Sequence, residues 1–189
     1  RWLVSSLKLS GYTVLVIDDG SSDETSNEAA SAGAEVLRNR VNQGKGASLI
    51  RGFSHVKRGD FDGVIVMDGD GQHLPEDIPA LLSAAGAGGN LVVGNRMARP
   101  GEMPLSRWLT NKFMSFLLSC LTRQRIPDSQ CGFRFISAST LAKLSLSCSN
   151  YEIESEMLLA AGRSGCKILS VPVKSVYCGT KSQIDPLLD

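Results

Sequence analysis

The sequence GVIVMDGDGQH, residues 63–73, joins a run of apolar residues directly to a turn that carries two aspartates. A short β-branched run bounded by Asp and Gly is typical of a strand buried in a parallel sheet. The stretch TVLVIDDGSSD, residues 13–23, has the same form. Ligands bind at the carboxyl ends of the strands in open α/β sheets, so both acidic turns are candidate binding sites.

Strand-like and helix-like patterns alternate around these two stretches. In the first half they predict strands and helices in turn over residues 13–17, 21–32, 35–37, 44–56, 63–67, 75–85 and 91–93. In the second half they predict helices over 104–121 and 151–163, strands over 131–136 and 168–173, and an extended tail over 177–182. Residues 21–23 are suited to cap the first helix. This alternation predicts an α/β layer with a mostly parallel sheet, and we expect one domain over residues 1–189 because no linker is visible.

The composition is that of a soluble globular protein. Of the 189 residues, 42% are hydrophobic and 21% are charged, which excludes a disordered, collagen-like or coiled-coil chain. The longest apolar stretch, around residues 113–121, is shorter than the roughly 20 residues that a membrane span requires. The five cysteines form no CxxC pair, so we expect a reducing compartment, no zinc ribbon and no disulfide framework.

Charge is unevenly distributed along the chain. Residues 1–94 hold 8 Lys and Arg against 12 Asp and Glu, whereas residues 95–189 hold 12 against 7. Six of the basic side chains fall between Asn95 and Arg125, with Glu102 as the one acid. This asymmetry favours a site with a metal on one side and anionic groups on the other, although two solvated faces would give the same pattern.

The turn Asp68-Gly69-Asp70-Gly71-Gln72-His73 is the sharpest local signal. Two carboxylates one residue apart can reach the same divalent ion, and the glycines between them let the backbone bend. Hard oxygen ligands with few protein groups suit Mg²⁺ or Mn²⁺ shared with a diphosphate. The structural alternative is an Asx-rich turn after a strand, and for His73 a single structural hydrogen bond.

Two glycine-rich segments do not match known phosphate-binding loops. Residues 42–46 fail the P-loop pattern because Asn39 and Gly46 stand where it requires glycine and Ser or Thr. Residues 86–89 fail the dinucleotide pattern because Leu91 replaces its last glycine. These sequences therefore predict loops. The turn at Asp18-Asp19 can instead accept hydrogen bonds from a base or a ribose, or simply end a strand before a helix cap.

Six blocks of the sequence together resemble family-2 glycosyltransferases of the GT-A fold. They are, in order, VIDDGSSDET (16–25), NQGKGAS (42–48), VMDGDGQHLPED (66–77), GNR (94–96), DSQCGFR (128–134) and YEIESEMLL (151–159). They are most similar to polyprenyl- or dolichyl-phosphate mannosyl- or glucosyltransferases, which move a hexose from a nucleotide sugar to a lipid phosphate. The resemblance implies a Rossmann-like three-layer sandwich around a mostly parallel sheet.

The same resemblance implies a role for individual residues. The ligands of Mg²⁺ or Mn²⁺ would be Asp68, Asp70 and Gln72. The residues that bind a UDP- or GDP-hexose would be Asp18, Asp19, Lys45 and Asp68. The acceptor phosphate would lie among Arg96, Arg107 and Asn111, and the residues at the reacting centre would be Asp128, Arg134 and Arg96.

A lipid-phosphate acceptor needs positioning more than it needs a base. The second pKa of a phosphate monoester is near ~6, so its oxygen is already anionic at neutral pH. Arginines that orient it would permit direct attack with inversion at the anomeric carbon. The alternatives are a saccharide hydroxyl acceptor, with Asp128 as base, and a nucleotide-sugar-binding module without turnover.

The expected partners follow from this resemblance. They are a nucleotide sugar, a polyprenyl or dolichyl phosphate and a membrane surface, with no nucleic acid. The helix predicted over 104–121 is apolar on most sides and carries Trp108, which suits a bilayer surface, while a half-buried helix is the alternative. We expect a cytoplasmic protein at the cytoplasmic face of a membrane. Two departures are a start beyond the family's first strand and no basic residue near 187–188.

Overall fold

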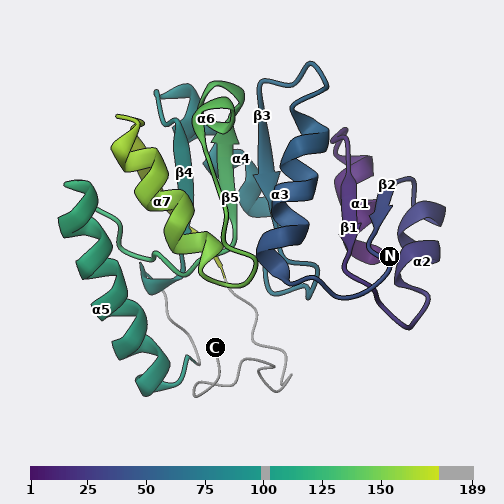
Figure 1. The fold of residues 1–189 in the computed structure, drawn as a ribbon, viewed down its shortest axis with the longest axis horizontal. Helices are drawn as coiled ribbons and strands as arrows, with labels where there is room; N and C mark the ends of the chain where they lie inside the picture. The colour runs from purple at the N-terminus through teal and green to yellow at the C-terminus, as the bar shows by residue number, and fades with distance from the viewer. Residues whose placement is uncertain (99–102, 175–189) are drawn as a thin grey trace.

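The structure is a computed structural model that describes residues 1–98 and 103–174 (Figure 1). The strands are β1 (Leu15–Asp18), β2 (Glu35–Arg38), β3 (Gly63–Val66), β4 (Leu91–Asn95), β5 (Arg134–Ser137) and β6 (Ile168–Pro172). The α-helices are α1 (Trp2–Leu9), α2 (Thr25–Ser31), α3 (Lys45–Val56), α4 (Ile78–Gly86), α5 (Leu105–Thr122), α6 (Ala138–Lys143) and α7 (Ile153–Arg163). Two 3₁₀ turns are η1 (Pro75–Asp77) and η2 (Arg96–Ala98).

A four-stranded sheet with the order β3-β5-β4-β6 forms the centre of the molecule. β4 and β6 are parallel, while β5 is antiparallel to both of its neighbours. Three of the four strands therefore run in the same direction, and the sheet is parallel apart from β5. β1 and β2 form a separate parallel pair. This arrangement confirms the mostly parallel α/β sheet predicted from the sequence.

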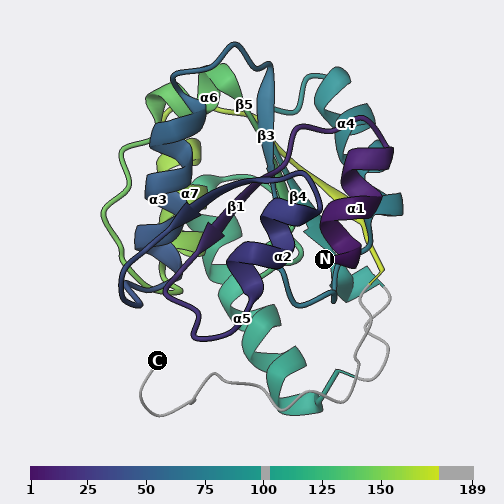
Figure 2. The ribbon, with the colours of Figure 1, turned by 90° about the vertical axis from the view of Figure 1, so that its right-hand side faces the viewer.

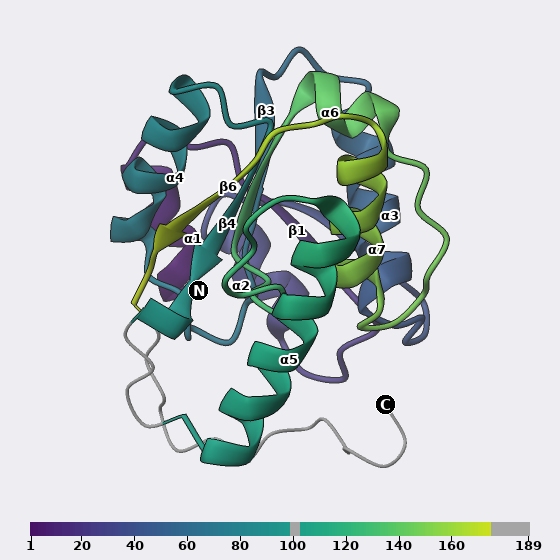
Figure 3. The ribbon, with the colours of Figure 1, turned by 90° about the vertical axis from the view of Figure 1, so that its left-hand side faces the viewer.

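Helices cover both faces of the four-stranded sheet, which gives three layers (Figures 2 and 3). α1 and α4 lie on one side, and α3, α6 and α7 lie on the other. α2 packs on the β1-β2 pair, and α3 contacts both β1 and α7. α5 packs along α7 at the outside of the molecule. No helix within the described residues is long and apolar enough to cross a membrane.

The core lies where the apolar strands meet these helices. Its fully buried members come from β4, the β5 region, α4 and α7, and they include Leu91, Val92, Phe133, Ile136, Leu81, Met157 and Leu158. Burial of side chains of this size stabilises the fold by roughly 1.5–3 kcal/mol each. The continuous apolar run of β4 agrees with a strand covered on both faces.

Most predicted elements are present, with boundaries shifted by a few residues. Two helices were not predicted, α1 and the six-residue α6. α2 begins at Thr25 rather than at residue 21 because residues 21–24 form turns, in which Asp18 accepts a bond from Ser21 N and Asp23 from Thr25 N. The four cysteines within the described ranges are free. The predicted tail at 177–182 and the segment at 187–188 lie outside those ranges, as do Glu102 and Cys178.

Candidate functional site

The acidic turn after β1 is closed by hydrogen bonds from the chain around it. Asp18 is buried and accepts from Ser21 N at 2.9 Å and from the Ser26 hydroxyl. Asp19 accepts from Asn39 Nδ2 at 2.7 Å, and from the backbone N–H groups of Gln43 and Gly44 at 2.9 Å each. Asp19 therefore fixes the loop that leads into α3.

This loop sets the position of Lys45, the first residue of α3. Gly44 has a positive φ of 91°, which glycine adopts without steric cost. On the other side, Ala47 N donates to Ser149 O at 3.0 Å, and a Cβ on Gly46 would collide with the backbone of residues 148–150. The start of α3 is thus held between the β1 turn and the segment that leads into α7.

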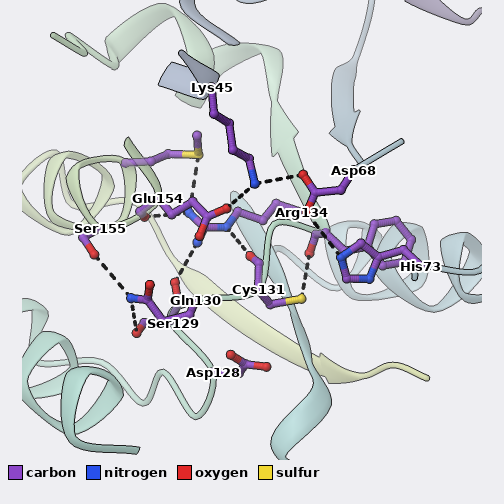
Figure 4. Close-up of polar contacts among 12 residues, drawn as sticks. Lys45, Asp68, His73, Asp128, Ser129, Gln130, Cys131, Arg134, Glu154 and Ser155 are labelled. Carbon is purple, nitrogen blue, oxygen red and sulfur yellow. Dashed lines mark hydrogen bonds and ion pairs between the residues drawn. The ribbon is translucent and has the colours of Figure 1, made fainter. Parts of the chain in front are cut away.

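Lys45 connects two acids that are far apart in the sequence (Figure 4). Its Nζ lies 2.8 Å from Asp68 Oδ1 and 2.6 Å from Glu154 Oε1. Asp68 follows β3, and Glu154 lies in the first turn of α7. Lys45 and Asp68, both predicted to bind the donor, are in direct contact. Glu154 had no predicted role, because its contact with Lys45 spans 109 residues of sequence.

Lys45 and Asp68 stabilise each other in the ionised state. Burial by itself raises the pKa of Asp68, but the His73 contact and the charge of Lys45 bring that pKa well below its usual range. Burial likewise lowers the pKa of Lys45, and the carboxylates of Glu154 and Asp68 outweigh it and raise the pKa. Asp68 is therefore a carboxylate at neutral pH, and 33% of its side chain stays exposed.

His73 and Gly132 shape the space beside Asp68. His73 is buried, stacks on the Phe133 ring and places Nε2 3.8 Å from Asp68 Oδ2. A Cβ on Gly132 would lie 2.7 Å from Asp68 Oδ2, 3.1 Å from Lys45 Nζ and 3.2 Å from Glu154 Oε1. Only glycine fits there without displacing the charged groups. The block DSQCGFR contains this glycine, but its spacing alone does not reveal the contact.

The other two predicted metal ligands lie in the open part of the same turn. Asp70 is exposed, and its Oδ1 accepts from Gln72 N at 2.9 Å. Gln72 is half-buried, and a Cβ on Gly69 or Gly71 would meet open space. Across residues 1–98 and 103–174, no group of three or more His, Cys, Asp or Glu side chains is placed to hold a metal ion. An ion at Asp68 and Asp70 must take its other ligands from elsewhere.

Arg96 and Asp128 form a buried pair rather than two separate groups. Arg96 Nε and Nη2 donate to the two carboxylate oxygens at 2.9 and 3.0 Å, and Arg96 N donates to Oδ2 at 3.0 Å. This two-pronged geometry is a strong charge-assisted contact. It joins the end of β4 to the segment before β5. Both oxygens of Asp128 are occupied by this pairing.

Arg134 lies in the interior, and its guanidinium binds backbone oxygens. It donates to Ser129 O at 2.8 Å, to Cys131 O at 2.8 Å and to Glu154 O at 2.7 Å. Its side chain is among the largest fully buried ones. Arg134 therefore ties the 129–132 segment to the start of α7 and fixes Gly132 beside Asp68 and Lys45. A role at the reacting centre stays a prediction.

The predicted acceptor residues Arg107 and Asn111 lie one turn apart on α5. Asn111 is buried and Arg107 is half-buried. One turn further on, buried Ser115 accepts from Ser129 N at 2.9 Å, which joins this polar face of α5 to the segment after Asp128. Within the described ranges, no hydrogen bond or ion pair joins Arg107 to Asp68. Arg107 lies on α5, whereas Lys45 and Glu154 lie at the starts of α3 and α7.

The outward face of α5 is apolar. Its exposed large side chains are Leu105, Leu109, Phe113, Phe116, Leu117 and Leu121, and Phe113 is 65% exposed. The helix contains no Asp or Glu. Exposed Lys112 lies over the Trp108 ring, 5.4 Å from its centroid. α5 therefore buries the polar Asn111 and Ser115 beside Leu118 and exposes a row of large apolar side chains, unlike an ordinary surface helix.

Comparison with known proteins assigns the family of this chain. The sequence model described as Glycosyl transferase family 2 matches residues 3–145. The chain belongs to glycosyl transferase family 2. It is therefore a glycosyltransferase, and the predicted resemblance to family-2 glycosyltransferases is confirmed.

Named relatives narrow the comparison within family 2. The undecaprenyl-phosphate mannosyltransferase of Micrococcus luteus is 32% identical, over 86% of this chain and 71% of that protein. The UDP-N-acetylglucosamine–dolichyl-phosphate N-acetylglucosaminyltransferase of Methanococcus voltae is 30% identical, over 93% and 79%. Both relatives are named for sugar transfer to a polyprenyl-type phosphate.

Solved structures confirm the GT-A type of fold. Glucosyl-3-phosphoglycerate synthase from Mycobacterium tuberculosis, in complex with Mg²⁺ and UDP, superposes with a TM-score of 0.69 at 23% identity. The match covers 95% of this chain and 67% of that one. A complex of the same enzyme with Mn²⁺ and UDP-glucose gives a TM-score of 0.67.

Proposed function

We propose that this glycosyltransferase is a metal-dependent, inverting enzyme that moves a hexose from a UDP- or GDP-sugar to a polyprenyl or dolichyl phosphate. The observation that carries the proposal is the ionised, partly exposed Asp68 beside exposed Asp70 at the carboxyl end of β3. Relatives named as polyprenyl-phosphate sugar transferases support the acceptor class.

The residues of the β3 turn fit Mg²⁺ or Mn²⁺. Asp68 is ionised, Asp70 is exposed, and a cation, the Lys45 ammonium, already lies on Asp68 Oδ1. Asp68, Asp70 and Gln72 would supply hard oxygen ligands. A set of three protein groups suits an ion that keeps water molecules or donor phosphates as its other ligands. When bound, such an ion stabilises the negative charge that develops on a departing diphosphate. The solved complexes with Mg²⁺ or Mn²⁺ and a uridine nucleotide concern a protein of the same fold.

Lys45 and the β1 turn would bind the nucleotide part of the donor. Lys45 brings an ammonium to the edge of the sheet beside Asp68, where a diphosphate would meet a positive charge. Asp19 positions the Lys45 loop, and its carboxylate is half-buried rather than enclosed. We assign the contact with the base or ribose to Asp19 in preference to Asp18, because Asp18 is buried.

Arg107 and Asn111 would hold the acceptor phosphate. The phosphate oxygen is anionic at neutral pH, so the protein must orient it and does not have to remove a proton. The oxygen attacks the anomeric carbon as the bond to the nucleoside diphosphate breaks, which inverts the configuration without a covalent enzyme intermediate. Arg96, held by Asp128 at the end of β4, would add positive charge on this side. Asp128 then acts as a positioning residue for Arg96.

The outward apolar face of α5 supports a membrane-bound acceptor. A helix with exposed Leu and Phe side chains, no acid and nearby Lys and Arg is suited to an anionic bilayer surface. Arg107 would then lie on a helix whose other face meets the lipid phase. Such a placement brings the phosphate of a long-chain lipid to the protein without moving its tail out of the bilayer.

The decisive experiment is a transfer assay with a panel of UDP- and GDP-hexoses. The acceptors are polyprenyl phosphate in vesicles, and a matched set of saccharides that offer only hydroxyl groups. We expect Mn²⁺- or Mg²⁺-dependent formation of a lipid-linked hexosyl phosphate of inverted configuration. Transfer to the saccharides alone would overturn the acceptor class, and donor binding without transfer to any acceptor would support a binding module instead.

A further inference from the structure

The Lys45 ammonium contacts one of the two carboxylate oxygens that a metal ion at Asp68 could use. Lys45 Nζ is 2.8 Å from Asp68 Oδ1, so the ammonium takes up one of the lone-pair directions of this carboxylate and part of its negative charge. Coulomb repulsion between the two cations also disfavours their coexistence at this distance. A metal ion that enters the site therefore competes with Lys45 for Asp68, and its charge favours the departure of the ammonium.

Glu154 keeps Lys45 at the site after such a displacement. Its Oε1 lies 2.6 Å from Nζ, and the carboxylate is buried in the first turn of α7. Arg134 binds the Glu154 backbone oxygen at 2.7 Å, which fixes the start of that helix. A lysine side chain has a flexible four-carbon stem, so Nζ can leave Asp68 while it stays on Glu154.

We propose that Lys45 is the resident counter-ion of Asp68, and that it passes to the donor diphosphate when a divalent ion binds, with Glu154 holding it throughout. This inference rests on the proposed metal and donor site. It makes Lys45 a residue that sets the order of binding: it opposes metal binding in the absence of nucleotide, and favours nucleotide in the absence of metal. Glu154 is the positioning residue that limits how tightly Lys45 binds Asp68.

The test is a pair of calorimetric titrations, Mn²⁺ without nucleotide, and UDP or GDP without metal. In Lys45→Met we expect Mn²⁺ to bind about 10-fold more tightly, because one charged hydrogen bond no longer competes for Asp68. We expect the nucleotide to bind about 10-fold more weakly in the same variant, because it loses a charge-assisted partner. Opposite shifts distinguish this role from a simple loss of structure.

Glu154→Gln provides the second variant, and Lys57→Met the matched control. Glu154→Gln leaves Lys45 with Asp68 alone, so Mn²⁺ alone should bind about 3-fold more weakly than in wild type. Lys57→Met removes the same charge from the exposed C-terminal end of α3, and should leave both affinities unchanged. Melting temperatures of all variants report whether the fold is retained.

The possible results separate this inference from the proposed function. If Lys45→Met binds both Mn²⁺ and the nucleotide more weakly than wild type, or binds both equally well, the proposed role of Lys45 is wrong. The proposed metal site is not contradicted by that result. A Lys57→Met variant that shifts as far as Lys45→Met would show a long-range charge effect and overturn it too. If wild type binds neither Mn²⁺ nor either nucleotide, the proposed function fails along with this inference.

Discussion

The turn after β1 and the turn after β3 each carry two aspartates, but the surrounding protein engages their carboxylates to different degrees. Asp18 and Asp19 accept hydrogen bonds from backbone N–H groups, from Ser26 and from Asn39. Within the described residues, the Asp68 carboxylate has ion-pair contacts with the side chains of Lys45 and His73, and Asp70 is exposed. A carboxylate that accepts several backbone and amide hydrogen bonds contributes strongly to the fold, whereas one with fewer such bonds is more available to a divalent ion.

The largest effect on hexose transfer is expected at the turn after β3. Asp68→Asn keeps the size of the side chain but removes the charge that a divalent ion requires. We expect the rate of hexose transfer to fall by about two to three orders of magnitude. Losses of this size follow the removal of a group that stabilises the charge developing in a transition state. Transfer rates at saturating Mn²⁺ measure this effect.

Asp62→Asn is the control for Asp68→Asn, since Asp62 is exposed immediately before β3. It should leave transfer unchanged. Equal losses in the two variants would show that charge near β3, rather than the Asp68 oxygen, matters.

The acceptor side should respond separately from both turns. Arg107→Ala should lower transfer to polyprenyl phosphate by about one to two orders of magnitude, because it removes charge-assisted hydrogen bonds of roughly 1.5–3 kcal/mol each. Donor affinity should scarcely change. Arg107→Lys should recover part of the loss, because an ammonium lacks the planar two-pronged donor.

Lys112→Ala removes the same charge from an exposed position of α5, and should have little effect on transfer. A loss of donor affinity in Arg107→Ala that matches its loss of transfer would assign Arg107 to the nucleotide side. Unchanged transfer would remove it from the acceptor site.

The free energy of unfolding should depend more on the turn after β1 than on the turn after β3. Asp19→Ala leaves Asn39, Gln43 and Gly44 without their acceptor, and we expect unfolding free energy to fall by about 2 kcal/mol, or a melting temperature lower by roughly 4–8 °C. Asp70→Ala removes one exposed bond within its own turn and should change stability by less than about 0.5 kcal/mol. Thermal melts of both variants make the comparison, and equal shifts would contradict it.

The smallest expected effect is the change in stability with pH that Asp19 causes. Burial raises the pKa of Asp19, but hydrogen bonds from Asn39, Gln43, Ser48 and Gly44 outweigh it and lower that pKa below its ordinary value. A lowered folded-state pKa gives stability that is complete above the unfolded pKa of about 3.9, and is lost as pH falls through the folded value. The stability difference between wild type and Asp19→Asn should therefore narrow below about pH 4. Urea midpoints measured down to acid pH test this, and a constant difference would contradict it.

The sequence predicted the strands and the two acidic turns because those features are local. A β-branched run followed by Asp and Gly marks both the strand and its end. The antiparallel direction of β5 was not predicted, because the sequence of residues 131–136 does not specify which neighbours that strand has. α1 has no side-chain cap, and α6 is only six residues long, so neither gives a clear helical signal.

The site was predicted less completely, because its contacts join distant parts of the chain. Asp68 and Lys45 were found through their motifs, but Glu154 lies in an ordinary helical pattern and reaches Lys45 only in the folded protein. Arg134 and Asp128 were expected at the reacting centre, and burial and pairing are properties that a motif does not encode. The fold shows both residues bonded to other protein groups.

The central claim is that the turn after β3, and not the turn after β1, binds the divalent ion. Paramagnetic broadening of amide signals in the isotope-labelled protein, titrated with Mn²⁺ in the presence of UDP or GDP, locates the ion directly. We expect the signals of Gly69, Gly71 and Gly132 to disappear first, at substoichiometric Mn²⁺, while those of Ala29 and Ala32 persist. Broadening centred on Gly20 and Ser21, or spread evenly over the protein, would contradict the account.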